Sequence, residues 1–282
     1  LESYNELLLS LDDAAGVAEL MFSVHPDESI RKAAEVCEQE IKKLYNAVKL
    51  DGGVFKALEQ ASKAGLEGQA QRFAEHSLRE FKRAGVDLDE ATRTELKKIH
   101  EEMTRLAQDF DRNVREDVRS IALAGQEALA GLPKDFVDAH KPGEDGKIRV
   151  NTSYPDFFPI QTYAEDKELR RRLYNEFLLR GYPANKEILT RLLKLRWRYA
   201  KALGYDSWAA YLAEDKMVRS APAIDSFIKE LKEACAPKNA ADLEKLLERK
   251  RKDEPTAQAV QMWDRFYYVG KVRAEDYDYD AQ

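Results

Sequence analysis

The residues best suited to metal chemistry are the histidines, of which the chain has four: His25, His76, His100 and His140. Zinc hydrolysis on a helix needs two His residues four positions apart, so that both imidazoles project from one face, with a Glu beside the first to activate water. His100-Glu101 begins this pattern, but Thr104 stands where the second ligand is required. A Thr hydroxyl does not replace a zinc-binding imidazole, so we predict no zinc site in this segment.

The other histidines do not complete a metal site either. His76 and Glu80 are four positions apart on a predicted helix, but no third ligand with matching spacing accompanies them. We expect this pair to be structural or solvent-exposed. His25 precedes Pro26 at a helix entrance and His140 lies in a loop, and we expect both to be turn residues. The sequence therefore predicts no metal-binding residue.

Other catalytic and cofactor-binding patterns are also missing from the sequence. There is no Gly-x-Ser-x-Gly nucleophile elbow, and neither Cys37 nor Cys235 lies in a Cys–His signature. The glycines form neither a dinucleotide-binding nor a phosphate-binding loop. We therefore predict no catalytic and no cofactor-binding residue. Two cysteines far apart in the sequence are typical of a reducing compartment, so we expect a cytoplasmic location and no disulfide.

The charge of the chain excludes some classes of partner. It has 282 residues, of which 35% are charged, and a net charge of −6. Phosphate binding needs clustered, uncompensated Lys and Arg, whereas the basic runs at 170–172 and 249–252 are interleaved with acidic residues. We interpret both runs as solvated helix faces and predict no nucleic-acid partner. No apolar stretch reaches the length of about 18–20 residues that spans a membrane, and no signal-peptide pattern is present at the start, so we expect no membrane partner.

Helical periodicity dominates the first part of the chain. Apolar residues recur every three or four positions from Pro26 to about Leu50, and Gly85 closes a later helix. A longer helix begins near Asp89, and its apolar stripe comprises Leu96, Ile99, Met103, Leu106, Phe110 and Val114. We interpret the stripe as an internal bundle seam, with a coiled-coil or cofactor-binding face as the alternative.

The pattern changes after Arg119. Residues 120–124 and 147–151 are short extended candidates, and Gly143-Glu144-Asp145-Gly146 supplies a turn. Helical spacing resumes near Ala164, with breaks near 181–183, 204–206, 221–222 and 236–237. We predict a mostly α fold: an elongated multi-helix lobe with a small antiparallel β-hairpin or sheet near residues 120–160. Its segments are an N-terminal helical segment at 1–118, a small β-containing insertion at 119–162, and a second helical segment at 163–282 that packs with the first as one lobe.

Alternating charges run from Asn113 to Ser120, where the long helix gives way to the first extended candidate. Such a junction could line a cleft. We favour the simpler interpretation that local ion pairs secure the end of the helix.

Short motifs follow one another along nearly the whole chain. They are Val24-His25-Pro26-Asp27, Gly131-Leu132-Pro133-Lys134-Asp135-Phe136, Tyr154-Pro155-Asp156-Phe157-Phe158-Pro159, Asn185-Lys186-Glu187-Ile188-Leu189 through Leu195-Arg196, Ala202-Leu203-Gly204-Tyr205 with Ala210-Tyr211, Lys216-Met217, and Trp263-Asp264-Arg265-Phe266-Tyr267-Tyr268. In order and spacing this series resembles the thimet oligopeptidase and neurolysin family of zinc metallopeptidases. Each motif is weak by itself, so the resemblance depends on their order.

The resemblance implies a mostly helical protein of two lobes that face each other across a deep channel. Zinc is then held by the lobe encoded mainly by a C-terminal part, which this chain is expected to lack. Family members hydrolyse internal bonds of short peptides, and zinc with a Glu activates the water. By this resemblance the chain is one channel wall, an inactive part of a zinc metalloendopeptidase. The family's zinc ligands, general base and stabilising Tyr or His have no matching position here.

We expect the residues shared with the family to be structural. Tyr154-Pro155 and Phe158-Pro159 predict an extended segment, and Trp263, Tyr267 and Tyr268 predict a helix anchored by buried rings. One alternative is a naturally truncated, noncatalytic helical protein that binds peptides or a partner. Another is a helical scaffold that binds no peptide. Leu1 in place of an initiating Met leaves a removed presequence open.

Overall fold

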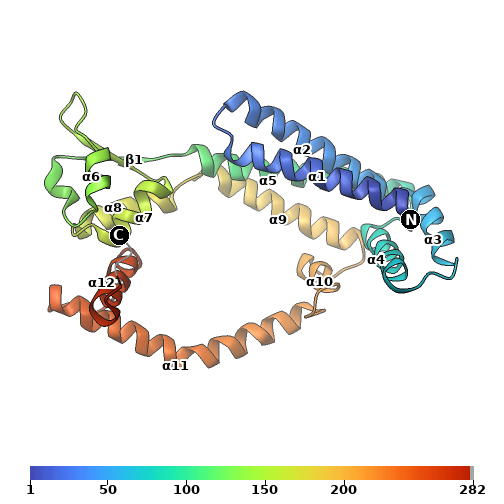
Figure 1. Ribbon diagram of the computed structural model, residues 1–282. Coiled ribbons are helices and arrows are strands. Elements are labelled where there is room, and N and C mark those ends of the chain that lie inside the picture. The colour runs from blue at the N-terminus through green and yellow to red at the C-terminus, as the bar shows by residue number, and fades with distance from the viewer. Residues whose placement is uncertain (280–282) are drawn as a thin grey trace. The chain divides into compact units, whose positions relative to one another are not determined.

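The computed structural model describes residues 1–279, and helices make up most of them (Figure 1). Twelve α-helices and one pair of antiparallel strands are present in this part of the chain. Contacts between residues divide the chain into two compact units: unit 1 is Leu1–Asp111 with Lys186–Ala221, and unit 2 is Arg112–Asn185 with Pro222–Gln282. The predicted mostly α fold with a small antiparallel β element is confirmed.

In the described residues, unit 1 is built from helices alone. They are α1 (Glu2–Val24), α2 (Glu28–Lys49), α3 (Gly52–Ser62), α4 (Gly68–Ala84), α10 (Trp208–Ala213), and most of α5 (Glu90–Glu116) and α9 (Ala184–Ala202). α1 packs along α2, and α3 packs on α4. The Asp27 carboxylate accepts a hydrogen bond of 2.7 Å from the Ser29 backbone N–H, which caps α2 near its predicted start.

The apolar stripe of α5 forms an internal seam, as predicted. The seam comprises Leu96, Ile99 and Leu106 of α5 with Leu192, Leu195 and Tyr199 of α9. Gly85 ends α4 beside it with a φ of 94°. A Cβ atom at Gly85 would approach Leu96 Cδ1 and Leu203 Cδ2 at 2.9 Å. Glycine therefore allows both the left-handed turn and the close approach to the seam.

Unit 2 contains the strand pair. β1 (Ser120–Leu123) pairs antiparallel with β2 (Ile148–Asn151), with Leu123 opposite Ile148, inside the predicted region. The predicted turn is present, and the Gly143 N–H donates to the Lys147 carbonyl at 2.9 Å. The other elements are the 3-10 helices η1 (Gln126–Leu129) and η2 (Met262–Asp264), and helices α6 (Lys134–Ala139), α7 (Tyr154–Tyr163), α8 (Lys167–Leu178), α11 (Ala221–Asp253) and α12 (Arg265–Tyr277).

The apolar core of unit 2 lies where the strand pair meets α7 and α8. It includes Ile121 and Leu123 of β1, Ile148 and Val150 of β2, Phe157 and Ile160 of α7, and Leu169 and Leu173 of α8. α12 packs against α7, and η2 packs against α8. The C-terminal elements are therefore held on the same core as the strands.

Two expectations about prolines were wrong. The segment from Tyr154 to Pro159 is not extended but forms the first part of α7. Pro155 lies in the first turn, where a backbone N–H has no helical partner to lose, and Pro159 is accommodated inside the helix. The helix break predicted at Ala236-Pro237 is also absent, because α11 continues through Pro237 to Asp253 as one curved ribbon (Figure 1). A proline removes one hydrogen bond and can bend a helix without ending it.

The division into segments at 1–118, 119–162 and 163–282 stays a prediction, and residues 280–282 of its last segment lie outside the described residues. Among residues 1–279, no helix combines the length and the apolar character that crossing a membrane requires.

Candidate functional site

His100, which begins the incomplete zinc pattern, lies on α5 with its Nδ1 atom buried and without a hydrogen-bond partner among the described residues. Its pKa is lowered because burial and the charges of Lys42 and Lys49 disfavour the imidazolium. The Thr104 hydroxyl donates to the His100 backbone carbonyl at 3.0 Å. The residue at the second ligand position is thus used to satisfy the helix backbone.

The remaining histidines have local contacts. His76 is exposed on α4, and Glu80 lies 3.4 Å from the Arg79 guanidinium. His140 follows the last residue of α6, and its Nε2 atom lies 3.2 Å from Asp156 Oδ1. His25, at the end of α1, accepts a 3.1 Å hydrogen bond from the Asp27 backbone N–H. Each of these contacts fixes a helix end or a helix surface.

No group of three or more His, Cys, Asp or Glu side chains in residues 1–279 is arranged to hold a metal ion. The side chains of this part of the chain therefore do not fit zinc, which needs at least three protein ligands. That the chain carries no catalytic, cofactor-binding or metal-binding residue stays a prediction.

The interpretation of the two basic runs as solvated helix faces is wrong for one residue of each run. Arg170 of α8 is 1% exposed and Lys250 of α11 is 3% exposed, whereas Arg172 and Arg251 are at the surface. Both buried cations contact Asp264, which is fully buried. Successive helix residues point about 100° apart, so one member of a basic run can turn inward while its neighbours stay solvated.

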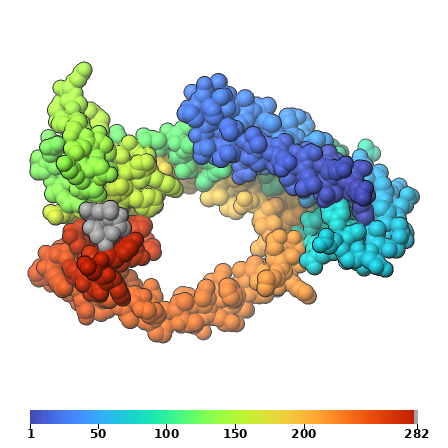
Figure 2. Space-filling model, in the orientation of Figure 1, coloured from blue at the N-terminus to red at the C-terminus, as the bar shows by residue number. Residues whose placement is uncertain are grey.

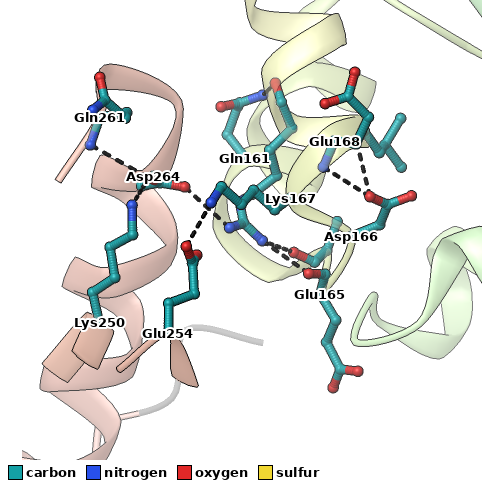
Figure 3. Close-up of polar contacts among 12 residues, drawn as sticks. Gln161, Glu165, Asp166, Lys167, Glu168, Lys250, Glu254, Gln261 and Asp264 are labelled. Atoms are coloured by element: carbon teal, nitrogen blue, oxygen red, sulfur yellow. Dashed lines mark hydrogen bonds and ion pairs between the residues drawn. The ribbon is translucent and has the colours of Figure 1, made fainter. Parts of the chain in front are cut away.

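The Asp264 carboxylate is bound on both oxygens (Figure 3). The Arg170 guanidinium donates to Oδ1 at 3.2 Å, and the Lys250 ammonium donates to Oδ2 at 2.6 Å. The Gln261 backbone N–H also donates to Oδ2, at 3.3 Å. We call Arg170, Lys250 and Asp264 the buried charge cluster. It joins α8 and α11 to the residue that precedes α12.

Backbone carbonyls take up the other donors of the two cations. Arg170 donates to the Ala164 carbonyl at 2.6 Å and to the Glu165 carbonyl at 3.2 Å. Lys250 donates to the Ala259 carbonyl at 3.1 Å. Buried charges are tolerated only when they are paired and hydrogen-bonded, and these contacts meet that condition for most donors. The Nε atom of Arg170 is buried and has no partner among the described residues.

Two tyrosine rings cover the cluster. The Arg170 guanidinium lies 4.0 Å from the centre of the Tyr267 ring, and the Lys250 ammonium lies 5.9 Å from the centre of the Tyr268 ring. Burial and the nearby charges of Asp253 and Glu254 raise the pKa of Tyr268. Both rings are buried, as predicted, whereas Trp263 is only half-buried.

The geometry of the cluster favours positioning over catalysis. A general acid or base must reach a substrate within hydrogen-bond distance. Asp264 has no exposed surface, and both its oxygens are already bound. What the carboxylate can do is neutralise two buried cations and hold the start of α12 against α8 and α11.

A cavity of about 370 Å³ is lined in part by Tyr267, whose ring covers Arg170 of the cluster. Its walls come mainly from α12, which contributes Lys271 and Arg273, and from the end of α7. Gly131 completes the wall with a φ of 85°. The cavity is therefore shaped by the same packing of α12 that the cluster fixes.

The alternating charges at the end of α5 form local ion pairs, as predicted. The Arg119 Nε atom lies 3.1 Å from both oxygens of Asp117, and its NH1 atom lies 3.3 Å from Glu176. The Gly181 backbone N–H donates to Asp117 at 2.9 Å. These contacts secure the transition from α5 to β1 inside unit 2.

The sequence did not predict that Arg170, Lys250 and Asp264 come together in a buried cluster. The signal available was Asp264 directly after Trp263, in an aromatic-rich segment whose rings were expected to be buried. A carboxylate in such a setting requires a cation, but the sequence does not say which of the many cations supplies it.

A family model described as Peptidase family M3 matches residues 160–282. That stretch contains every residue of the buried charge cluster. Saccharolysin of Saccharomyces cerevisiae is 26% identical to this chain over 276 residues, which are 92% of this chain and 38% of saccharolysin.

Two further relatives also match most of this chain but less than half of their own length. The thimet-like oligopeptidase of Dictyostelium discoideum is 24% identical over 271 residues, 90% of this chain and 40% of the relative. The probable cytosolic oligopeptidase A of Arabidopsis thaliana is 26% identical over 259 residues, 86% of this chain and 36% of the relative. The chain thus spans less than half the length of each. By the family match and these relatives together, the chain is related to the thimet oligopeptidase-like peptidases of family M3.

Proposed function

We propose that this chain is the N-terminal, channel-wall portion of a zinc-dependent oligopeptidase that hydrolyses internal bonds of short peptides. The observation that carries the proposal is the match of residues 160–282 to peptidase family M3. The relative lengths support it, because the chain spans 38% of saccharolysin and 40% of the thimet-like oligopeptidase. Its partners in the parent protein are then the C-terminal catalytic lobe and short peptide substrates.

On this proposal the segment is inactive by itself. The donor side chains of residues 1–279 do not fit zinc, so the metal and the groups that act with it belong to the rest of the parent protein. We therefore derive no catalytic step for this chain. Its contribution is the shape of one wall.

The buried charge cluster gives this wall a specific task. It fixes the start of α12 on α8 and α11, and α12 is the last helix within residues 1–279. We propose that in the parent protein this anchoring sets the direction in which the chain leaves unit 2 toward the catalytic lobe. A site that must be accurate to a fraction of an ångström needs rigid supporting elements.

A noncatalytic protein that binds peptides or a partner is the second candidate, and one observation favours it. On α11 the apolar side chains of Phe227, Ile228 and Leu231 are each more than 50% exposed. Figure 2 shows the orange part of α11 with its side chains at the surface. Clustered exposed apolar residues commonly mark an interaction surface. Either a catalytic lobe or a separate partner would cover this apolar surface.

For the location we propose the cytoplasm. One relative is named a cytosolic oligopeptidase, whereas another, from Phaeosphaeria nodorum, is named a mitochondrial intermediate peptidase. Imaging of the product of the complete reading frame, tagged at its C-terminus, tests this directly. Signal confined to an organelle would contradict the proposal.

The test of function compares the product of the complete reading frame with residues 1–282. Both are assayed with internally quenched short peptides, and bound zinc is measured by metal analysis. We expect the complete protein to bind zinc and to cleave internal bonds in a chelator-sensitive way, and residues 1–282 to do neither. Stoichiometric zinc and chelator-sensitive cleavage by residues 1–282 would overturn the claim of inactivity.

The reading frame itself separates the two candidates. A frame that continues into a His-Glu-x-x-His motif supports the peptidase. A frame that ends near residue 282 favours the noncatalytic protein. In that case saturable binding of short peptides, measured by calorimetry, would distinguish a binding protein from a scaffold.

A further inference from the structure

Unit 1 contains a cavity of about 520 Å³ that the proposed peptidase function does not explain. Its lining residues come from α2, α4, α5, α9 and α10, and all of them belong to unit 1. Cavities of about 300–1,000 Å³ are the usual size for small organic ligands.

Positive charge exceeds negative charge around this cavity. Lys42, Lys49 and Arg196 line it, against the single carboxylate of Glu80. Glu80 is engaged by other cations, because its Oε1 atom lies 3.4 Å from the Arg79 guanidinium and 3.8 Å from Arg83 Nε. Lys42 pairs with Glu38. In the described part of the chain, Lys49 and Arg196 line the cavity and neither forms a close ion pair.

Burial affects two polar groups in the cavity wall, Lys49 and His100. Burial lowers the pKa of Lys49, with nearby Glu80 and Asp12 opposing that effect and Arg83 adding to it. The Nδ1 atom of His100, also in the cavity wall, is buried without a partner among the described residues. Buried polar atoms almost always have a hydrogen-bond partner, so the unpartnered Nδ1 atom of His100 points to a bound molecule.

Aromatic rings form the rest of the wall. Tyr199, Trp208 and Tyr211 contact one another, with ring centres 5.4–5.8 Å apart. The Arg196 guanidinium lies 5.8 Å from the centre of the Trp208 ring, and the Lys49 ammonium lies 4.8 Å from the centre of the Tyr45 ring. The cavity therefore offers cations and flat apolar surfaces side by side.

We propose that this cavity binds a small organic anion in which a carboxylate or a phosphate is joined to a flat ring. Lys49 and Arg196 bind the anionic group, and the ring packs against Trp208 and Tyr211. Among the described residues that line the cavity, Glu80 is the one carboxylate, and Arg79 and Arg83 lie within ion-pair distance of it, so the wall carries a net positive charge. The anion site goes beyond the proposed peptidase function, and its test does not depend on peptide cleavage.

Isothermal titration of the whole chain with four probes tests the chemistry. The probes are 3-phenylpropionate, phenyl phosphate, inorganic phosphate and phenethylamine. We expect the two aromatic anions to bind with a Kd on the order of 1 mM or below, given ligands of this size. Inorganic phosphate should bind at least about tenfold more weakly, and phenethylamine not at all. The tighter of the two aromatic anions identifies the anionic group. No binding of either aromatic anion, or equal binding of the amine, would overturn the proposal.

Matched variants locate the binding. Lys49→Met and Arg196→Met should each raise the Kd of the tighter-binding aromatic anion by about tenfold, which is the usual effect of losing one charge-assisted contact. Lys32→Met and Arg198→Met are the controls, because these residues lie on the same helices but do not line the cavity. Lys49→Met should not lower the melting midpoint, because it removes a poorly solvated charge. An equal loss of binding in the control variants would contradict the assignment.

Discussion

Arg170 and Asp264 are 94 positions apart in the sequence, yet their side chains are in contact at 3.2 Å in an interior where neither is more than 1% exposed. Lys250 binds the other oxygen of the same carboxylate. The start of α12 is therefore fixed by charge as well as by apolar packing.

Asp264→Asn should destabilise unit 2 by about 3–5 kcal/mol, because it leaves two buried cations without a counter-ion. Urea unfolding, with hydrogen exchange in α8 and α12 as the local probe, measures the effect. Asp225→Asn is the control, since Asp225 pairs with Lys229 on the exposed surface of α11. The control should cost less than about 1 kcal/mol. Equal effects of the two substitutions would show that the cluster does not stabilise α12.

Lys250→Met should be less harmful than Asp264→Asn. The cluster has two cations and one carboxylate, so removal of Lys250 leaves a neutral Arg170–Asp264 pair. We expect a loss of about 1–3 kcal/mol from the missing hydrogen bonds to Asp264 and to the Ala259 carbonyl. Chemical denaturation of both variants under one set of conditions gives the order. A larger loss for Lys250→Met than for Asp264→Asn would contradict the argument from charge balance and would show that the hydrogen bonds of the ammonium outweigh it.

Gly131→Ala should cost about 2–4 kcal/mol. Gly131 has a φ of 85°, and a Cβ atom there would overlap the backbone carbonyl oxygen of Tyr163. Gly146→Ala is the matched control, with a φ of 71° but nothing within 4 Å of its Cβ position. The control carries only the backbone strain, about 1 kcal/mol. Thermal unfolding of both variants separates the two costs, and equal shifts would show that the Tyr163 carbonyl can move aside.

The stability difference between Lys49→Met and the natural chain should depend on pH. Because burial lowers the pKa of Lys49 from 10.5, the unfolded chain binds more protons than the folded chain between the lowered pKa and 10.5. The contribution of Lys49 to stability therefore rises with pH in that window. The gain in unfolding free energy of Lys49→Met over the natural chain should be largest at neutral pH and should shrink as pH approaches 10.5. Denaturation at a series of pH values measures it, and a difference independent of pH would contradict the burial of this charge.

Much of the helical architecture could be predicted because its causes are local. The spacing of Leu96, Ile99 and Leu106 gives one apolar face at the helical period, and Asp27 supplies the capping oxygen where α2 begins. The turn before β2 was predictable for the same reason, since Gly143 and Gly146 lie next to that strand, whereas β1 is separated from β2 by η1 and α6. The prolines at 159 and 237 could not be judged in this way, because a helix tolerates a lost hydrogen bond when packing or continuity compensates.

The sequence by itself therefore determined three things about this protein: that it is mostly helical, where a small β element interrupts the helices, and which family it resembles. Helical periodicity, helix caps and motif order can all be read from neighbouring residues. Tertiary structure alone decided which member of each basic run is buried. Arg170 and Arg172 differ little in their local sequence, but only Arg170 faces Asp264. The convergence of Lys49, Arg196 and His100 on one cavity was decided in the same way. Burial and pairing depend on which helix faces meet, and that is set by packing across long stretches of chain.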